Sequence, residues 1–542
     1  MNYLAKDKIQ LKDKTQLVDY SKHGELYEWF TNTVTKYENK TALISDTHSL
    51  SFSKAKDIVD NVIKLLITNR VYQGDTILAC FENGFLIPLI ALACSKMRVT
   101  IVPISPSLQS EQIKNIFKVA KPHIVMSSDK ANTKLNEALE KDLALGVLHF
   151  VFNSSHDFET PRVFGEKELV ITDNKNLLGD NKNYTFIMNF TSGSTGDPKP
   201  VLISEAAKIC RLKEGTIKLF NLEEHDNILI TTPQYHSLGF RQSILPLILG
   251  GTGIILERFS AESWLVSSEK YKVTFCIAVS SQLAQLANLI SESNKNIPTS
   301  IKKLVSSSAP LDMFTRQKCL EHFPCDIFEV YGLSETGIAT YKKLCRGQLQ
   351  DNSVGIPLNS VSLKLFDKDQ NSFIEKTNSI GEIAIDCNSR FHGYKNNFDF
   401  PNSHFYQNHF LTGDLGYFDS KGELHFAGRT KEVIQNSGIN VYPHDVETAV
   451  KNFPNITDAC VFGVTEHNST EKIVLLYTTS AEINENSLIR FLFYNLAHWQ
   501  LPKFYKKIEH LTFTQMGKID RQSMRNQFQS EFLGEFKCLN KN

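Results

Sequence analysis

The chain has no excess of charge of either sign. Its 59 lysine and arginine residues balance its 59 aspartate and glutamate residues, so the formal net charge is zero. Proteins that bind nucleic acid or anionic membranes through their overall charge are basic. The composition therefore predicts small-molecule partners and no nucleic-acid partner.

Long apolar runs are missing as well. The most apolar segment, GFLIPLIALAC (84–94), is broken by Pro88 and followed by Lys96 and Arg98, so it falls short of the ~18 residues that a membrane span requires. The N-terminal MNYLAKDKIQ lacks the apolar core of a signal peptide. The ten cysteines include no CxxC pair and predict reduced, mostly buried thiols. These observations predict a cytoplasmic protein without integral membrane association, in which 84–94 is a buried helix.

Internal repeats are also absent, and 542 residues exceed what one hydrophobic core usually supports. Helix-like and strand-like patterns alternate along the first part of the chain, at 110–120, 123–127, 273–279, 281–290, 301–308 and 326–330. This alternation predicts an α/β fold of layered subdomains with largely parallel strands.

The pattern changes after Val354. The short segments SVSLKLFD, GEIAID and GELHFAG are strand-like and joined by polar turns, which predicts a small antiparallel β-barrel or sheet. A compact α+β segment begins at about Arg429, and the tail EFKCLNKN is expected to be loosely ordered. We therefore expect a large N-terminal domain over 1–428 and a small C-terminal domain over 429–542.

The loop NFTSGSTGDPKPV (189–201) follows an apolar strand-like run. Its hydroxyls and glycines can wrap a polyphosphate, and Lys199 adds a point charge. The Walker pattern GxxxxGK[ST] fails, because Pro198 stands five residues after Gly193. Taken alone, the loop could equally be a flexible surface loop.

Four more motifs follow in order: PQYHSLGF (233–240), EVYGLSETG (329–337), LTGDLGYFDSKGELHFAGRTKEVIQNSGINVYP (411–443) and MGKIDR (516–521). Together with the loop they resemble the adenylate-forming superfamily, which includes acyl-CoA synthetases, 4-coumarate-CoA ligases, peptide-synthetase adenylation domains and beetle luciferases. The resemblance covers roughly residues 25–525. It implies that a carboxylic acid attacks the α-phosphate of ATP to form acyl-AMP and pyrophosphate, and that a thiol then displaces AMP.

The resemblance also implies residue roles. The loop would hold the β- and γ-phosphates, and Glu335 would bind a magnesium ion. Asp414 would accept hydrogen bonds from both ribose hydroxyls, and Lys518 would bridge the substrate carboxylate and the α-phosphate. The catalytic set is Lys518, Thr336, Glu335 and His236, and the metal-binding residue is Glu335. The nucleotide- or thiol-binding set is Thr191, Ser192, Gly193, Ser194, Thr195, Gly196, Lys199, Ser308, Ala309, Glu329, Tyr331, Gly332, Ser334, Asp414, Arg429, Lys431 and Gly438.

Within this set, Thr336 would contact the α-phosphate, Tyr331 would pack on the adenine opposite the turn 306–310, and Arg429 would support the ribose. Lys431 matches the hinge about which the small domain rotates, after which Gly438 would line a thiol tunnel. As an alternative to phosphate chemistry, Ser334 to Thr336 could cap a helix.

The substrate is less specified. No acid stands near His236, which disfavours an α-amino acid, and His236 either gates an apolar tunnel or packs in the core. The neighbouring ILPLILGG favours a fatty or aryl acid. Gln435 and Ser437 replace two lysines of coumarate ligases, His409 replaces a tryptophan, and Pro200 replaces a common glycine.

Coenzyme A is the expected acceptor, and the thiol of a separate carrier protein is the alternative. A catalytically silent nucleotide-binding scaffold is a third interpretation. Such a scaffold is expected to have lost Glu335, Asp414 or Lys518, all of which are present.

Overall fold

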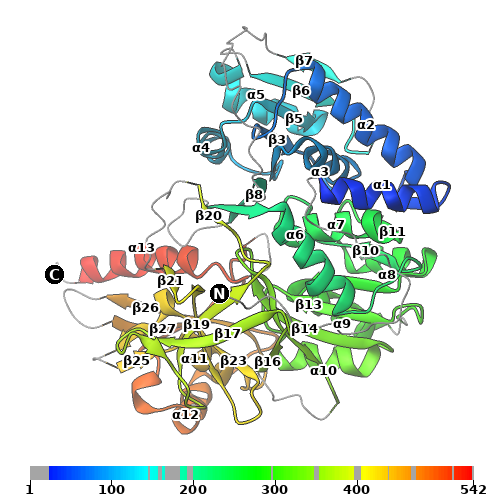
Figure 1. Ribbon diagram of the computed structural model, residues 1–542. Coiled ribbons are helices and arrows are strands. Elements are labelled where there is room, and N and C mark those ends of the chain that lie inside the picture. The colour runs from blue at the N-terminus through cyan, green and yellow to red at the C-terminus, as the bar shows by residue number, and fades with distance from the viewer. Residues whose placement is uncertain are drawn as a thin grey trace.

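Two β-sheets organise the chain up to Arg429, and a smaller α+β unit follows them (Figure 1). The computed structural model describes residues 24–143, 147–156, 161–164, 184–191, 199–293, 297–346, 353–395, 404–436, 439–465, 471–514 and 518–539. The predicted α/β fold class is confirmed.

The first sheet consists of β3 (Thr76–Cys80), β4 (Thr100–Ile104), β5 (Ile124–Ser128), β6 (Leu148–Phe152), β7 (Arg162–Phe164), β8 (Thr185–Thr191), β9 (Lys199–Ser204) and β20 (Gly393–Tyr394). The strands lie in the order β20-β9-β8-β4-β3-β5-β6-β7. The central strands are parallel, whereas β7, β9 and β20 are antiparallel to their neighbours. Strands β3 to β6 are buried along their whole length, because helices cover both faces of the sheet.

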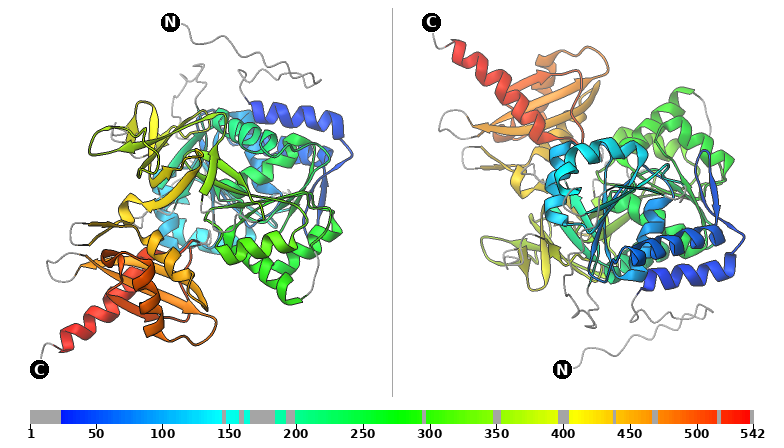
Figure 2. Two further views of the ribbon diagram at one scale, coloured as in Figure 1. Left: turned by 90° about the horizontal axis from the view of Figure 1, so that it is seen from below. Right: turned by 90° about the horizontal axis from the view of Figure 1, so that it is seen from above.

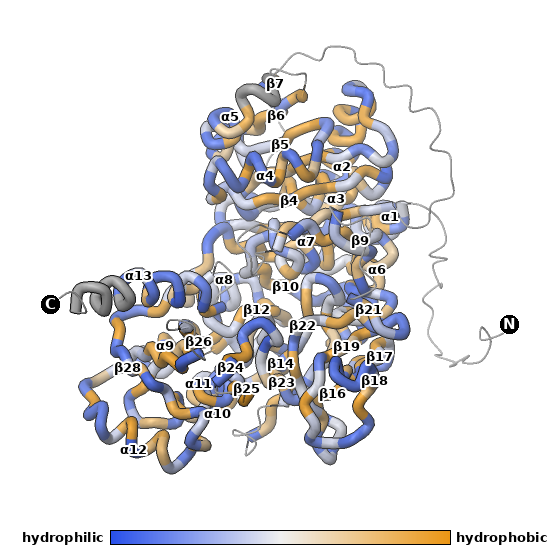
Figure 3. Tube along the Cα trace, turned by 90° about the vertical axis from the view of Figure 1, so that its left-hand side faces the viewer, coloured by the Kyte–Doolittle hydropathy of each residue, from blue (hydrophilic) through white to orange (hydrophobic). Residues whose placement is uncertain are grey.

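The covering helices are α1 (Glu25–Tyr37), α2 (Phe52–Thr68), α3 (Leu86–Met97), α4 (Ser110–Ala120) and α5 (Asp129–Leu143). Helices α4 and α5 share one hydrophobic core with the sheet, and α1, α2 and α3 share the core on its other face. Helix α3 is the predicted buried helix, and ten of its residues, from Leu86 to Ser95, are buried. Figure 3 shows hydrophobic residues concentrated along the strands of this region. Among the described helices, none combines the length and the apolar character that crossing a bilayer would need.

The second sheet begins with seven strands: β1 (Thr41–Ile44), β2 (Ser49–Ser51), β10 (Asn227–Ile230), β11 (Thr252–Ile255), β12 (Phe275–Val279), β13 (Lys303–Ser307) and β14 (Asp326–Leu333). It continues with β15 (Gly337–Lys343), β16 (Ser353–Pro357), β17 (Val361–Asp367), β18 (Ser372–Phe373), β19 (Gly381–Cys387), β21 (Phe405–Tyr406), β22 (His409–Phe418) and β23 (Leu424–Arg429). The strands from β15 onward pair antiparallel, as expected. Through β14 and β15 they are hydrogen-bonded to the parallel part in one path.

The helices on the second sheet are α6 (Glu205–Leu212), the π-helix η1 (Lys213–Lys218), α7 (Ser237–Leu249), α8 (Ala261–Lys270), α9 (Ser280–Ser293) and α10 (Met313–His322). Residues of α6 and α7 belong to the same core as α1 and α3, so this layer of helices lies between the two sheets. The predicted strand and helix segments at 110–120, 123–127, 273–279, 281–290 and 326–330 all coincide with observed elements.

The C-terminal unit contains the 3-10 helix η3 (Thr430–Glu432), β24 (Ile434–Asn436), β25 (Ile439–Val441), α11 (Pro443–Lys451), β26 (Ile456–Thr465), β27 (Glu471–Thr479), α12 (Glu485–Asn495), the 3-10 helix η4 (His498–Gln500), β28 (Phe504–Lys507) and α13 (Arg521–Leu539). It has hydrophobic cores of its own, and Figure 2 shows it projecting to one side of the N-terminal layers. The expectation of a loosely ordered tail from Glu535 is wrong, because helix α13 continues to Leu539.

Candidate active site

The motif SETG forms a tight turn between two antiparallel strands. Strand β14 ends at Leu333 and β15 begins at Gly337. A Cβ on Gly332 would lie 2.0 Å from the carbonyl oxygen of Gly337, and Gly337 has a φ of +75°, so both positions require glycine. The alternative in which Ser334 to Thr336 cap a helix is wrong, because no helix begins there.

Arg211, on α6, holds this turn in place. Its guanidinium donates to the backbone carbonyls of Ser334 at 2.9 Å, Glu335 at 2.9 Å and Ser389 at 2.8 Å. The Ser389 hydroxyl donates in turn to the carbonyl of Thr336 at 2.7 Å. Each of the three turn residues therefore has its carbonyl satisfied from outside the hairpin. The side-chain carboxylate of Glu335 takes no part in these contacts.

The Glu335 carboxylate accepts a 2.7 Å hydrogen bond from the Tyr394 hydroxyl. The same tyrosine ring lies 5.6 Å from the Lys199 ammonium. Lys199 pairs with Thr191 across β8 and β9, so the two ends of the phosphate-loop motif meet beside Glu335. The loop residues Ser192, Gly193, Ser194, Thr195 and Gly196, and also Gly438, lie outside the described residues.

Asp414 is the best-partnered carboxylate of the site. It is 4% exposed, lies opposite Arg429 in the β22–β23 register, and accepts a 3.1 Å bond from Arg429 Nε on Oδ1. Its Oδ2 accepts a 2.9 Å bond from the Tyr331 hydroxyl. Each oxygen has one protein donor and keeps acceptor capacity for one more. This arrangement leaves room for two neighbouring hydroxyl donors.

Burial raises the pKa of Asp414, and the charge of Arg429, the Tyr331 hydroxyl and Lys518 oppose that shift. Burial and the charge of Asp414 also raise the pKa of Tyr331, so its hydroxyl stays protonated and donates.

Lys518 enters this group from the C-terminal unit. Its backbone closes a short hairpin in which Thr514 N donates to the Lys518 carbonyl at 2.7 Å. Lys518 is exposed to solvent, but the protein groups around its side chain remove part of its hydration. This desolvation and the charge of Arg429 lower its pKa, whereas Asp414 and Glu335 oppose the shift. The charges of both carboxylates therefore act on Lys518.

Arg521 fixes the segment that carries Lys518. It donates to the Val461 carbonyl at 2.8 Å, to Glu432 at 3.1 Å and to Glu447 at 2.6 Å. Glu432 follows Lys431, so the predicted hinge and the lysine segment share one ion pair. Burial lowers the pKa of His404, and the charges of Lys199 and Lys431 add to the shift, which indicates that both lysines lie near His404.

The turn after β13 is supported by Glu329. Ser308 has a φ of +81°, a strained conformation for a residue with a side chain. Glu329 accepts from Leu311 N at 2.9 Å and pairs with Arg316 at 2.8 Å. This carboxylate therefore supports the turn that holds Ser308 and Ala309, and its expected place in nucleotide binding stays a prediction.

His236 immediately precedes α7. Burial lowers its pKa to about 4, so the ring is neutral at pH 7. Its Nε2 is buried and has no hydrogen-bond partner among the described residues. Both interpretations of His236, a gate of an apolar tunnel and a packed core histidine, stay predictions.

Three further residues position the site: Arg211, Tyr394 and Arg521. The first two lie in no recognised motif, and Arg521 lies in MGKIDR but had no role assigned to it there. Their partners lie 124, 59 and 89 residues away in the sequence. The one available signal for Arg211 is its place in a helix whose buried residues include the charged Glu205 and Lys208.

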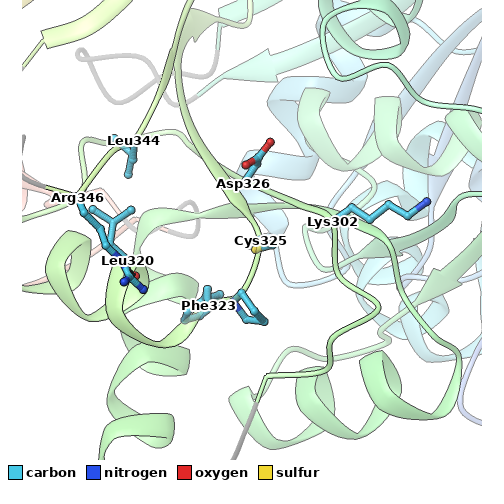
Figure 4. Close-up of a pocket in the computed structure, with 8 residues that line it drawn as sticks. Lys302, Leu320, Phe323, Cys325, Asp326, Leu344 and Arg346 are labelled. Atoms are coloured by element: carbon cyan, nitrogen blue, oxygen red, sulfur yellow. Dashed lines mark hydrogen bonds between the residues drawn. The ribbon is translucent and has the colours of Figure 1, made fainter.

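A separate pocket, lined by residues that include Lys302, Cys325, Asp326 and Arg346, is shown in Figure 4. It lies at the start of β14, whereas Tyr331 lies near the end of that strand, on the order of 15 Å away. This pocket is not part of the site.

Glu335 suits a magnesium ion because its carboxylate offers hard oxygen ligands. Among the described residues there is no cluster of three or more His, Cys, Asp or Glu side chains. Magnesium bound together with phosphates takes only one or two carboxylates, so the residues present fit such an ion.

Comparison with known proteins agrees with this geometry. The model of the family described as "AMP-binding enzyme" matches residues 30–395, more than half of the chain. The chain belongs to the AMP-binding enzyme family.

Its relatives include an oxalate–CoA ligase of Arabidopsis thaliana, 24% identical over 92% of this chain and 97% of the relative. The fold matches ATP-bound MatB from Rhodopseudomonas palustris with a TM-score of 0.81, 20% identity, and coverage of 94% and 99%. It also matches the Bacillus subtilis o-succinylbenzoate coenzyme A synthetase in complex with ATP and magnesium ion, with a TM-score of 0.77, 20% identity, and coverage of 92% and 99%. The family and the relatives support an ATP-dependent acid–thiol ligase.

Proposed function

We propose that this chain activates a carboxylic acid with ATP as an acyl-AMP and then transfers the acyl group to coenzyme A. The observation that carries the proposal is the convergence of Tyr331, Asp414, Arg429, Glu335 and Lys518 between the second sheet and the C-terminal unit. Three separate motifs supply these residues.

In this proposal Asp414 accepts the ribose hydroxyls through the acceptor capacity that Tyr331 and Arg429 leave open. Tyr331 presents its ring to the adenine, because its hydroxyl is fixed on Asp414. The loop 192–196 and Lys199 contact the pyrophosphate end of ATP. Thr336 stands next to Glu335 at the α-phosphate.

Attack of a carboxylate on a phosphate brings two anions together, so positive charge and positioning supply most of the catalysis. A magnesium ion, when bound at Glu335, neutralises charge on the phosphate oxygens. Lys518 lies between the acid carboxylate and the α-phosphate and neutralises both. Because Lys518 is carried by the smaller domain, a rotation of that domain can move its charge into and out of the site.

In the second half-reaction, a thiol has to take the position that Lys518 holds in the first half-reaction. We propose domains at 1–428 and 429–542 with a hinge at Lys431, so that rotation withdraws Lys518 and brings Gly438 to the site. Glu432, the residue after Lys431, accepts a hydrogen bond from Arg521 in the segment that carries Lys518, and this contact supports the division. Activity in the cytoplasm completes the proposal; the sequence alone led to the expectation of a fatty or aryl acid as the substrate.

The test is exchange of pyrophosphate into ATP with a panel of carboxylic acids, followed by coenzyme A and detection of a thioester. We expect acid-dependent exchange and thioester formation. Absence of exchange with every acid would contradict acid activation; exchange without a coenzyme A product would point to a carrier-protein thiol.

A further inference from the structure

A group of buried polar side chains lies between the sheets without protein partners. Lys208 on α6 and Gln242 on α7 are 0% exposed, and Arg241 is 5% exposed. Within the described residues, Lys208 Nζ, Arg241 Nε and both amide atoms of Gln242 have no hydrogen-bond partner. The buried amide of Asn189, on neighbouring β8, is also unpartnered. Since more than about 90% of buried polar groups are normally paired, this concentration requires an explanation.

Lys208 lies close to the first turns of α7. The Lys208 ammonium is 4.8 Å from the centre of the Phe240 ring, and Phe240 directly precedes Arg241 and Gln242. Burial and the charges of Arg211 and Arg241 all lower the pKa of Lys208. We call Lys208, Arg241 and Gln242 the α6–α7 cluster.

The described part of the chain supplies no acid to neutralise this cluster. The carboxylate on the same helix, Glu205, accepts from Leu26 N, Ser95 Oγ and the Tyr184 hydroxyl instead. No described carboxylate acts on Lys208 or Arg241. Buried charges are otherwise paired, because an isolated one is strongly unfavourable.

The cluster adjoins the proposed active site. Arg211, which couples electrostatically to Lys208 and Arg241, donates to the carbonyls of Ser334 and Glu335. One side chain thus separates the cluster from the turn where the acid carboxylate and ATP are proposed to react. Three nitrogen atoms of Arg211 donate to backbone carbonyls. The atoms available to a ligand are therefore the unpartnered ones of the α6–α7 cluster.

We propose that the α6–α7 cluster binds the far end of the substrate, and that the substrate is a carboxylic acid with a second anionic group. This inference rests on the proposed acid activation and names its substrate class. A carboxylate or a sulfonate would accept from Lys208 and Arg241. It replaces the fatty or aryl acid expected from the sequence, because an apolar tail would leave these atoms unsatisfied.

Acid-dependent pyrophosphate exchange with matched acids tests the proposal. The panel pairs linear monocarboxylic acids with dicarboxylic and sulfonate-bearing acids of the same chain length, and includes aryl acids with and without a second carboxylate. We expect kcat/KM to favour the doubly anionic member by at least about 100-fold, because sites built to hydrogen-bond a substrate group reject the analogue that lacks it. Preference for sulfonates over dicarboxylates, or the reverse, identifies the second anion.

The variants Lys208→Met and Arg241→Met should each remove most of this preference while leaving the KM for ATP within about twofold of the wild-type value. Lys218→Met, at an exposed lysine of η1 that pairs with Glu214, is the matched control and should change neither. Exchange supported by monocarboxylic acids alone, in wild type and variants equally, would overturn the inference and leave acid activation standing. No exchange with any acid would overturn both.

Calorimetry provides a readout that does not require turnover. Titration of wild type with the preferred diacid should show saturable binding, and Lys208→Met should bind the same diacid at least about 10-fold more weakly, because it loses a charge-assisted hydrogen bond. Equal affinity of the two proteins would refute anion binding at Lys208.

Discussion

Asp414→Asn tests the nucleotide assignment most directly. The amide oxygen can still accept from Arg429 Nε, and the amide nitrogen can donate to the Tyr331 oxygen, so both protein contacts of 3.1 and 2.9 Å can persist. The amide nitrogen cannot accept a ribose hydroxyl, however. Loss of one charge-assisted hydrogen bond costs about 1.5–3 kcal/mol, so kcat/KM for ATP should fall about 10- to 150-fold.

The assay is pyrophosphate exchange with ATP, 2′-deoxyATP and 3′-deoxyATP. Wild type should discriminate against both deoxynucleotides, and Asp414→Asn should lose that discrimination for at least one of them, because the missing contact is the one that the hydroxyl would make. The melting temperature should change little, since Arg429 is exposed and remains hydrated. If the variant discriminates against both deoxynucleotides as strongly as wild type does, the ribose assignment is refuted.

Three further variants test the remaining roles. Lys518→Ala should reduce acyl-AMP formation at least about 100-fold but spare thioester formation from supplied acyl-AMP; equal loss in both half-reactions, measured separately, would contradict the bridging role. Lys431→Pro should slow thioester formation more than pyrophosphate exchange, and parallel slowing would contradict the hinge. Tyr394→Phe removes the 2.7 Å bond to Glu335, and the magnesium concentration for half-maximal exchange should rise about 10-fold. An unchanged magnesium dependence would show that Tyr394 does not support metal binding.

Local patterns predicted much of the fold. The helix at 110–120 begins and ends as its spacing predicts, because its apolar residues at 113, 116, 117 and 120 face one core. The continuity of the antiparallel strands with the parallel sheet was not predictable in this way. It depends on pairing between β14, β15 and β16, which no local period encodes.

Contacts between site residues could be predicted within a motif, but not between residues that are far apart in the sequence. Asp414 and Arg429 are 15 residues apart in one motif, and a hairpin brings them together. Arg211 lies in no motif and reaches a turn 124 residues away, so only the folded chain reveals it. Glu329 lies inside a motif that predicts a nucleotide contact, and the folded chain adds an ion pair with Arg316 that the motif did not indicate.

The same geometry restricts the length of the doubly anionic acid. Its reacting carboxylate must lie at the face of the Ser334–Thr336 turn that Glu335 and Lys518 share, and its second anion must reach Lys208 and Arg241 on the other side of Arg211. The acid therefore has to span about the length of an arginine side chain, which two directly joined carboxylates cannot do. Pyrophosphate exchange with a series of linear diacids should rise with chain length to an optimum and then fall. A maximum at the two-carbon diacid would show that the two anions bind side by side at the turn, and would remove the α6–α7 cluster from substrate recognition.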